Sequence, residues 1–374
     1  MTPLPRLIAS YDSRRPLDRA ETPPKSWYVD PRVAELEQRT VFARTWQFVG
    51  RVDQVREPGQ YLTADVSGEP VVVVRGRDGA LRGFFNVCRH HAAIVMPQPC
   101  GKATALKCPY HGWTYGLEGK LVSNGEFEEV CGFEKSQNGL MPLAAETWEQ
   151  FVFVRIEPAG PSLREYLGDM GEQVAALRLD KLHFVERRTW ELNCNWKVFV
   201  DNYLDGGYHV PHAHQALGSV LDYARYRIDC FDRFVRQSSP IDSAGGDADA
   251  AATRRGDMAH YYWLHPNFML NWYEGYMDIN VVYPLGVDRC RVLFDFFFAD
   301  AAPASPDDAR AVEQARSIAM AERVQDEDIE VCESVQRGLS SRAYETGRLS
   351  VRREAGEHLF HRLLHRDLQS SGAD

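Results

Sequence analysis

The chain has 374 residues, of which 43 are Lys or Arg and 53 are Asp or Glu, so its formal net charge is −10. This acidic balance argues against a nucleic-acid partner, which favours a clustered basic face. No run approaches the roughly 18 apolar residues of a membrane helix, and the N-terminus lacks the apolar run of a signal peptide. We therefore expect a cytoplasmic protein without a membrane partner, whose eight cysteines are free thiols or metal ligands rather than disulfides.

The first part of the chain predicts an arm, a helix and then a β domain. Residues 1–26 are polar and proline-rich, and Pro31 suits the first turn of a helix over 31–46. From 48 to 156, short β-rich runs such as 71–75 are separated by glycine-containing turns. This texture predicts a compact antiparallel β domain.

The remainder of the chain mixes helices and strands. The expected elements are helices at 162–180, from Trp196 onward and from Ser305 to Gly338, and strands at 184–194, 277–284 and 289–299. Segment 237–257 is low in complexity and is expected to be a loop. The patterns predict an α+β protein in three parts: an arm and helix (1–45) that packs with the C-terminal domain, a β domain (46–157) and an α+β domain with an antiparallel sheet (158–374).

Two short motifs of the β domain each pair a cysteine with a histidine, Cys88–Arg–His90 and Cys108–Pro–Tyr–His111. A zinc finger normally pairs Cys with Cys and His with His in its two halves. A Rieske [2Fe–2S] cluster needs two cysteines on one iron and two histidines on the other. The spacing therefore predicts a Rieske cluster held by these four residues, with a zinc site as the alternative. His91, next to a ligand in the chain, is expected to point elsewhere.

A second histidine-rich segment contains His209, His212 and His214. Non-haem Fe(II) oxygenases bind iron through two histidines and one carboxylate. On an ideal helix His209 and His212 share a face. However, Pro211 disturbs the helix here, and a break can bring His209 and His214 together. The geometry alone leaves both pairs open.

Both motifs resemble one known family. Phe85–Asn–Val–Cys–Arg–His90 and Cys108–Pro–Tyr–His–Gly–Trp–Thr–Tyr115 look like the Rieske domain of ring-hydroxylating oxygenases. Asp201–Asn–Tyr–Leu–Asp–Gly–Gly–Tyr–His–Val–Pro211 and Cys332–Glu–Ser–Val–Gln–Arg–Gly–Leu339 are similar to choline-monooxygenase-like members of that family. The similarity extends from about residue 40 to about residue 366.

This resemblance implies a mononuclear iron beside the cluster. Its histidine ligands match His209 and His214, which leaves His212 outside the ligand set. The third ligand is expected on the helix near the C-terminus, where Asp328 fits the family's Glu–Asp pair and Asp326 is the alternative. Without an iron site, these acids would be read as the solvated face of a helix.

The resemblance also implies an electron path between the centres of neighbouring subunits. Many family members carry an acidic bridging residue three positions before the first iron histidine, but this chain has Gly206 there. The bridge is therefore assigned to Asp205, one position earlier. Asp201 and Asn202, in the same segment, complete the expected catalytic residues.

The implied reaction is hydroxylation or demethylation of a small choline-like or betaine-like compound. It uses O2 and electrons from a separate NAD(P)H-dependent reductase or ferredoxin, because no glycine-rich dinucleotide fingerprint is present. The family's electron path between subunits implies a homotrimer.

Aromatic residues can hold a quaternary ammonium through cation–π attraction. The expected substrate-binding residues are Tyr203, Phe268, Trp272 and Tyr273, with core packing as the alternative for each. Two other functions stay open, a hydroxylase or demethylase of an aromatic acid and an electron-transfer protein with an inactive iron site.

Overall fold

A computed structural model describes residues 2–242, 246–299 and 308–370. The chain divides into two compact units, one of Phe42–Gly171 and one of Met1–Val41 with Glu172–Asp374. The domain limits expected from the sequence, near residues 45 and 157, stay a prediction. No helix in the described ranges is long and apolar enough to cross a membrane.

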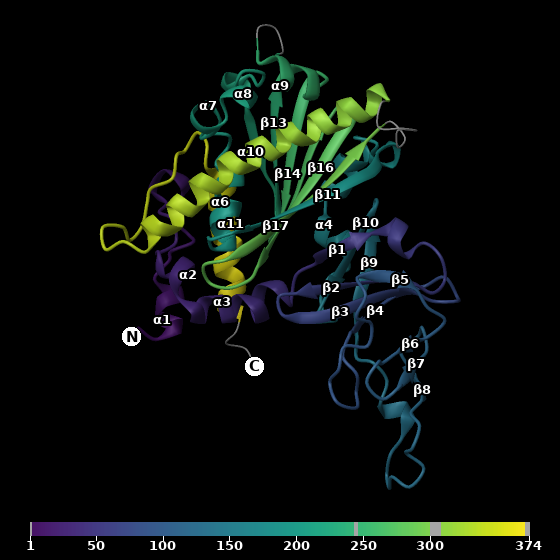
Figure 1. Ribbon diagram of the computed structural model, residues 1–374. Helices are drawn as coiled ribbons and strands as arrows, with labels where there is room; N and C mark the ends of the chain where they lie inside the picture. The colour runs from purple at the N-terminus through teal and green to yellow at the C-terminus, as the bar shows by residue number, and fades with distance from the viewer. Residues whose placement is uncertain (1, 243–245, 300–307, 371–374) are drawn as a thin grey trace. The chain divides into compact units, whose positions relative to one another are not determined.

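The unit Phe42–Gly171 is built from two antiparallel sheets (Figure 1). The larger sheet has the strand order β1-β10-β9-β4-β3-β2-β5, and the smaller one has the order β6-β7-β8. Their bounds are β1 Gln47–Arg51, β2 Gln60–Val66, β3 Glu69–Arg75, β4 Leu81–Phe85, β5 Cys100–Lys102, β6 Leu106–Lys107, β7 Thr114–Tyr115, β8 Leu121–Ser123, β9 Pro142–Trp148 and β10 Phe151–Arg155. The helix α4 (Leu163–Leu167) follows the last strand.

Strand β3 separates two apolar cores in this unit, because successive side chains of a strand point to opposite faces. Val72 and Val74 belong to a core that also contains Cys88 and Cys108, whereas Val71 packs in the other core with Leu62 and Val152. The two cysteines of the motifs are therefore anchored in a buried layer.

The second unit is organised around one seven-stranded antiparallel sheet of order β11-β17-β16-β15-β14-β13-β12. The strands are β11 His183–Leu192, β12 Arg227–Cys230, β13 Phe234–Pro240, β14 Met258–Leu264, β15 Phe268–Tyr273, β16 Tyr276–Pro284 and β17 Cys290–Phe298. Its helices are α1 Leu4–Ala9, α2 Ser26–Val29, α3 Pro31–Glu37, α6 Trp196–Leu204, α7 Val210–Ala213, α8 Gln215–Gly218, α9 Ala248–Thr253, α10 Ala309–Leu339 and α11 Ala355–Gln369. Helix α5 (Met170–Ala175) spans the boundary between the two units.

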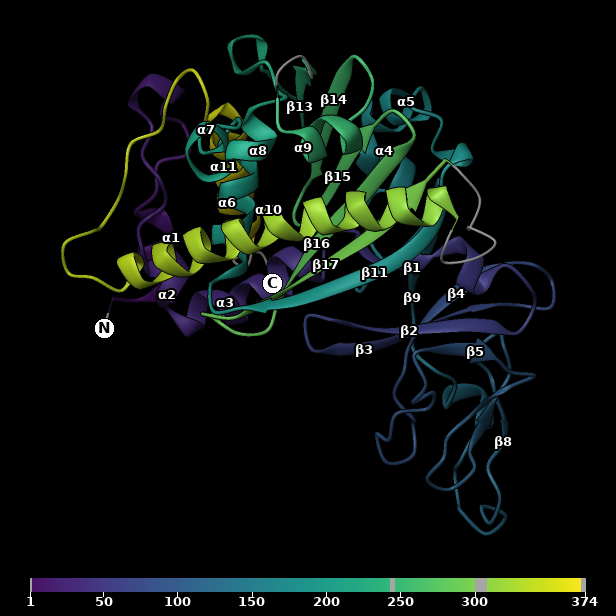
Figure 2. The same ribbon diagram turned by 45° about the horizontal axis from the view of Figure 1, so that its top comes forward.

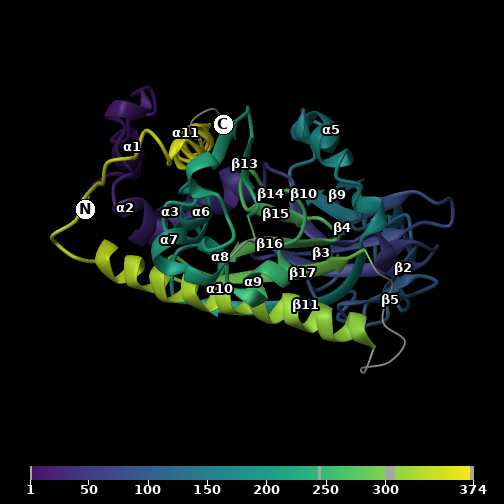
Figure 3. The same ribbon diagram turned by 90° about the horizontal axis from the view of Figure 1, so that it is seen from above.

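The long helix α10 runs across one face of this sheet (Figure 1). Figures 2 and 3 show α8 and α9 on the same side of the sheet as α10. The face thus covered is the one that carries the histidine-rich segment. The expected α+β class with an antiparallel sheet is confirmed.

Several expected elements differ from the observed ones. The helix expected over 31–46 is α3, continued by a π-helical turn at Gln38–Phe42. The helix expected over 162–180 is broken into α4 and α5, since Gly168 between them has φ +51°.

The loop expected over 237–257 is wrong for most of its described residues, because they form the end of β13 and the whole of α9. Residues 243–245 of that segment lie outside the described residues. The expected helix start at Ser305–Asp307 also lies outside them. Helix α10 begins at Ala309, with the Asp308 side chain capping the backbone N–H of Arg310.

Candidate metal centres and cavity

The Cys88 and Cys108 loops have the same backbone hydrogen bonds. The N–H of Cys88 donates to the carbonyl of Ala93 and the N–H of Ala92 donates to the carbonyl of Cys88, at 2.8 and 3.0 Å. In the second loop, Cys108 N–H donates to Trp113 and Gly112 N–H donates to Cys108, at 2.8 and 3.1 Å. Two matching turns therefore present one cysteine and one histidine each.

The four side chains fit a cluster with one buried and one outer end. Cys88 and Cys108 are buried, and burial raises the pKa of Cys108 with the adjacent Cys88 thiol adding to it. The rings of His90 and His111 lie 4.7 Å apart at their centroids, and His111 is exposed. Nδ1 of His90 is buried and has no hydrogen-bond partner among the described residues, as expected of a metal-binding atom. His91 does not point elsewhere, contrary to the expectation. Its ring centroid lies 3.9 Å from that of His90, and one ligand atom each of His90, His91 and His111 lie within 4.8 Å of one another.

Tyr115 and Trp113 support the same site. The Tyr115 hydroxyl accepts the backbone N–H of Arg89 at 3.0 Å and lies 3.3 Å from the Cys88 sulfur. The Trp113 ring stacks on His90 with a 3° interplanar angle. Such outer contacts fix ligand orientation and adjust the redox potential of a bound cluster.

A break in the helix positions the second pair of histidines. Helix α6 ends at Leu204, and His209 and His214 flank the single short helix α7, which has Pro211 in its first turn. Their Nε2 atoms lie 3.0 Å apart, whereas His212 is exposed. The structure thus brings together the i, i+5 pair and leaves the i, i+3 pair apart.

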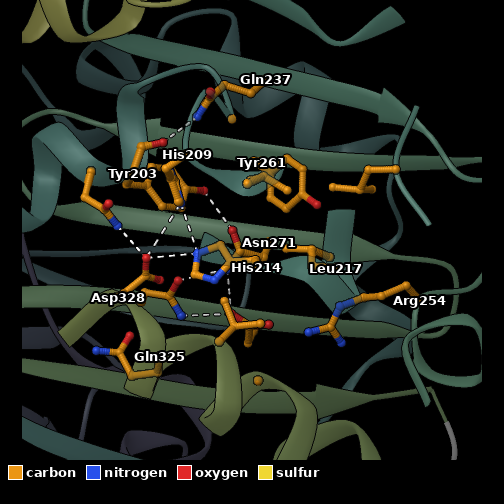
Figure 4. A pocket seen from close by; sticks show the side chains of 18 of the residues that line it. Tyr203, His209, His214, Leu217, Gln237, Arg254, Tyr261, Asn271, Gln325 and Asp328 are labelled. Atoms are coloured by element: carbon orange, nitrogen blue, oxygen red, sulfur yellow. Dashed lines mark hydrogen bonds and ion pairs between the residues drawn. The ribbon is translucent and has the colours of Figure 1, made fainter. Parts of the chain in front are cut away.

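Asp328 on α10 completes a group of three convergent ligand atoms (Figure 4). Its Oδ1 lies 3.0 Å from His214 Nε2 and 3.6 Å from His209 Nε2. Ligand atoms about 2.1 Å from a metal and at right angles lie about 3.0 Å apart, so this spacing fits the facial triad of a non-haem iron. Asp326 is exposed on the same helix.

Each imidazole of this group is held by a carboxylate at its other nitrogen. His209 Nδ1 lies 2.6 Å from Asp205, and His214 Nδ1 lies 2.7 Å from Glu327. Burial opposes protonation of His214, but Asp328 and Glu327 outweigh burial and raise its pKa. Such carboxylates fix the tautomer of a metal-binding histidine and leave Nε2 free for the metal.

Gly206 is required by the turn between α6 and His209. Its φ is +66°, and a Cβ there would lie 2.2 Å from the carbonyl oxygen of Arg353. An acidic residue therefore cannot occupy the family's usual bridging position. Asp205, one residue earlier, reaches His209 instead, where it also accepts the backbone N–H at 2.9 Å.

Asn202 and Asp201 point in different directions. Asn202 donates to Asp328 Oδ1 at 2.7 Å and so orients that carboxylate. Asp201 instead accepts the Tyr28 hydroxyl at 2.7 Å and lies 3.0 Å from His361. With His361 and Glu357, Asp201 forms a separate group of convergent metal-binding atoms. Its expected catalytic role stays a prediction.

The three iron-ligand candidates line a cavity of about 120 Å³. Six aromatic residues line it, namely Phe199, Tyr203, Tyr226, Tyr261, Tyr273 and Phe294. Burial raises the pKa of Tyr203, Tyr226 and Tyr261 well above its ordinary value, so these phenols stay neutral. The cavity therefore offers aromatic faces beside the metal ligands.

Two expected substrate-binding residues do not line this cavity. Phe268 and Trp272 alternate along β15 with Asn271 and Tyr273, which do line it. Because side chains alternate across a strand, Phe268 and Trp272 face the other side of the sheet, and the expectation for them is wrong. Tyr203 lines the cavity, and its hydroxyl donates to Asn271 at 2.8 Å.

Sequence reasoning missed several residues of this site, among them Glu327, Arg254 and Gln237. Glu327 could have been found, because it precedes Asp328 in the Glu–Asp pair. Arg254 and Gln237 line the cavity from the segment expected to be a loop, where no periodic pattern indicated buried residues. Arg254 is only 4% exposed.

Comparisons with known proteins agree with this geometry. Residues 45–134 match the Rieske [2Fe–2S] domain, and residues 179–370 match the ring-hydroxylating alpha subunit catalytic domain. A choline monooxygenase of Arabidopsis thaliana is 39% identical over 97% of this chain and 87% of its own length. The carnitine monooxygenase oxygenase subunit of Escherichia coli is 30% identical over 87% of this chain and 86% of its own.

Two solved structures have the same fold. The quaternary ammonium Rieske monooxygenase CntA, bound to its substrate L-carnitine, is 29% identical with a TM-score of 0.79, covering 94% of this chain and 96% of its own. A naphthalene 1,2-dioxygenase from Rhodococcus shares the fold at 20% identity and a TM-score of 0.76, covering 94% of this chain and 95% of its own.

Fold and matches together define a Rieske non-haem iron oxygenase, with a [2Fe–2S] cluster and a mononuclear iron. The chain belongs to the ring-hydroxylating oxygenase alpha-subunit family. Its relatives along nearly the whole chain are monooxygenases, so the expected enzyme class is confirmed, and an electron carrier with an inactive iron site is set aside.

Proposed function

We propose that this chain is the oxygenase component that hydroxylates or demethylates a small quaternary-ammonium compound. The observation that carries the proposal is the cavity, which is lined both by aromatic side chains and by the convergent residues His209, His214 and Asp328. A quaternary ammonium has no N–H group and cannot donate a hydrogen bond, but the faces of aromatic rings attract its positive charge. The relatives named choline and carnitine monooxygenase support the same substrate class.

The small volume of the cavity also supports a small quaternary-ammonium substrate. Pockets for drug-sized ligands measure about 300–1,000 Å³, whereas this cavity measures about 120 Å³. A compact substrate fits this space better than a molecule of several fused rings.

We assign each of the two metal centres to its own set of residues. By their motif spacing and the Rieske match, Cys88, His90, Cys108 and His111 would hold the cluster. The convergent residues His209, His214 and Asp328 would hold the iron. When bound, the cluster supplies electrons and the iron supplies the activation of O2.

The surrounding carboxylates position these groups. Asp205 and Glu327 orient the two imidazoles, and Asn202 orients Asp328. We further assign Asp205 to the electron path between the centres, because it touches His209 and because the family's usual bridging position is Gly206.

The reaction also needs partners outside the chain. We infer a separate NAD(P)H-dependent reductase or ferredoxin as electron donor and a homotrimer in which electrons cross between subunits, both working in the cytoplasm. Sedimentation of the purified chain and cross-linking to a donor protein would test these two inferences.

A second candidate is a hydroxylase or demethylase of an aromatic acid. The buried Arg254 in the cavity favours it, because guanidinium groups bind carboxylates.

A substrate screen separates the two. With a surrogate reductase, O2 uptake would be compared for choline, trimethylglycine and L-carnitine against benzoate and methoxybenzoate, with the products identified by mass spectrometry. We expect product only from quaternary-ammonium compounds. Product formed only from the aromatic acids would contradict the proposal.

A further inference from the structure

The guanidinium of Arg254 is buried in the wall of the cavity, and part of its hydrogen-bonding capacity is unused. Its Nε and Nη1 atoms are buried and have no hydrogen-bond partner among the described residues. The guanidinium lies over two rings instead, with its central carbon 4.7 Å from the centroid of Tyr273 and 5.2 Å from that of Tyr276. Arginine stays protonated in proteins, and a buried charge is unfavourable unless it is paired. The charge of Asp278 acts on Arg254, but no carboxylate of the described residues contacts its Nε or Nη1.

The nearby carboxyl group of Asp278 does not fill this place. Asp278 also lines the cavity, but its oxygens accept hydrogen bonds from the Tyr276 hydroxyl at 2.6 Å, Asn271 at 2.7 Å and Asn280 at 2.8 Å. In the described part of the chain no ion pair joins it to Arg254. A guanidinium that stacks on rings keeps its N–H groups in its own plane, where they can bind a carboxylate by two parallel hydrogen bonds.

We propose that Arg254 binds a carboxylate of the substrate, so that the substrate is a zwitterion with a quaternary ammonium and a carboxylate group. This inference rests on the proposed function and narrows it. Because Arg254 covers Tyr273, the ammonium group is expected against other rings of the cavity, such as Tyr203 and Tyr261.

The cavity also orients such a substrate. Figure 4 shows Arg254 on the opposite side of the cavity from His209 and Asp328. A carboxylate at Arg254 therefore places the ammonium end, and hence an N-methyl carbon, towards the iron ligands.

Oxidation at that carbon is demethylation. One oxygen atom of O2 enters a C–H bond to give N–CH2–OH, and the other leaves as water, with two electrons from the reductase and two protons consumed. The C–N bond then breaks, so that formaldehyde, a proton and the tertiary amine are released.

Helix α10 holds Arg254 in place through α9. Arg316 of α10 forms an ion pair with Asp249 of α9, and Arg255 forms one with Glu313 of α10. Gly256, with φ +89°, completes the turn, since a Cβ there would lie 2.8 Å from the Cβ of Glu274. The helix that carries Asp328 thus also positions the anion-binding residue.

Binding of a matched pair of ligands tests the proposal on the intact enzyme. Trimethylglycine and its amide have nearly the same shape, and only the first has a carboxylate. Calorimetry would measure both on the wild-type protein, on Arg254→Met and on the control Arg14→Met, whose side chain is exposed and lies outside the cavity lining. We expect the wild type to prefer trimethylglycine by about 10- to 100-fold, the value of one charge-assisted contact.

Arg254→Met should lose this preference while binding the amide as before, and Arg14→Met should keep it. The visible absorption of the cluster would show that each variant is folded. A folded Arg254→Met that still prefers the carboxylate would overturn the proposal. If Arg254→Met fails to fold, the wild-type preference decides, and equal binding of acid and amide overturns it.

Turnover separates this proposal from the broader one. Formaldehyde released from trimethylglycine by the wild type supports the orientation described above. O2 uptake with choline but not with trimethylglycine would overturn the zwitterion while leaving a quaternary-ammonium oxygenase standing. Absence of binding and uptake for every quaternary-ammonium compound would overturn both.

Discussion

Replacing Asp205 by asparagine, with Glu327→Gln as a matched control, separates two roles of Asp205. Both carboxylates hold Nδ1 of an iron-ligand candidate, at 2.6 Å from His209 and 2.7 Å from His214. Asparagine still accepts the backbone N–H of His209 but removes the charge. If both acids only orient an imidazole, each change should lower turnover or iron affinity by about 10- to 100-fold.

If Asp205 also lies on the electron path, its variant should lose more. Stopped-flow spectroscopy of the reduced enzyme, mixed with O2 and substrate, would follow reoxidation of the cluster through its visible absorption. We expect Glu327→Gln to be reoxidised about as fast as the wild type when iron is saturating, and Asp205→Asn at least about tenfold more slowly than Glu327→Gln. Equal reoxidation rates in the two variants would refute the assignment of Asp205 to the electron path.

Two further substitutions test the iron ligand on α10 and the buried ion pair between Lys197 of α6 and Glu37. Asp328→Asn should remove turnover and bound iron, whereas Asp326→Asn on the exposed face should leave both unchanged. O2 uptake and metal analysis would measure the two effects, and equal losses would contradict the assignment of Asp328 as the iron ligand. Glu37→Ala should lower the free energy of unfolding by about 3–5 kcal/mol in urea titrations. The reason is that it leaves the buried Lys197 ammonium, 2.7 Å from Glu37, without its partner. The exposed Glu35→Ala is the control, and similar unfolding of both variants would contradict the reasoning.

Local chemistry explains what the sequence predicts well. The cluster residues lie in two short loops, so their spacing alone specifies a set of ligands. The iron histidines needed more, because only a helix break around Pro211 brings His209 and His214 together. Their choice over His212 came from the family resemblance.

Tertiary packing explains what the sequence does not predict. Alternation along β15 divides its aromatic residues between two faces, but it does not say which face meets the metal ligands. The sequence therefore predicts Phe268, Trp272 and Tyr273 alike as substrate-binding residues, whereas of β15 the cavity is lined by Asn271 and Tyr273. Arg254 lies in a segment rich in alanine and aspartate, and its buried guanidinium packs over Tyr273 and Tyr276, which belong to two later strands.

Iron content tests the central claim most directly. The account predicts about three irons per chain in the wild type, two in the cluster and one at the mononuclear site. His209→Ala should retain about two irons and the visible absorption of the cluster but show no turnover. About three irons in this variant, or loss of the cluster absorption on replacing His209, would contradict the division of the ligands between the two centres.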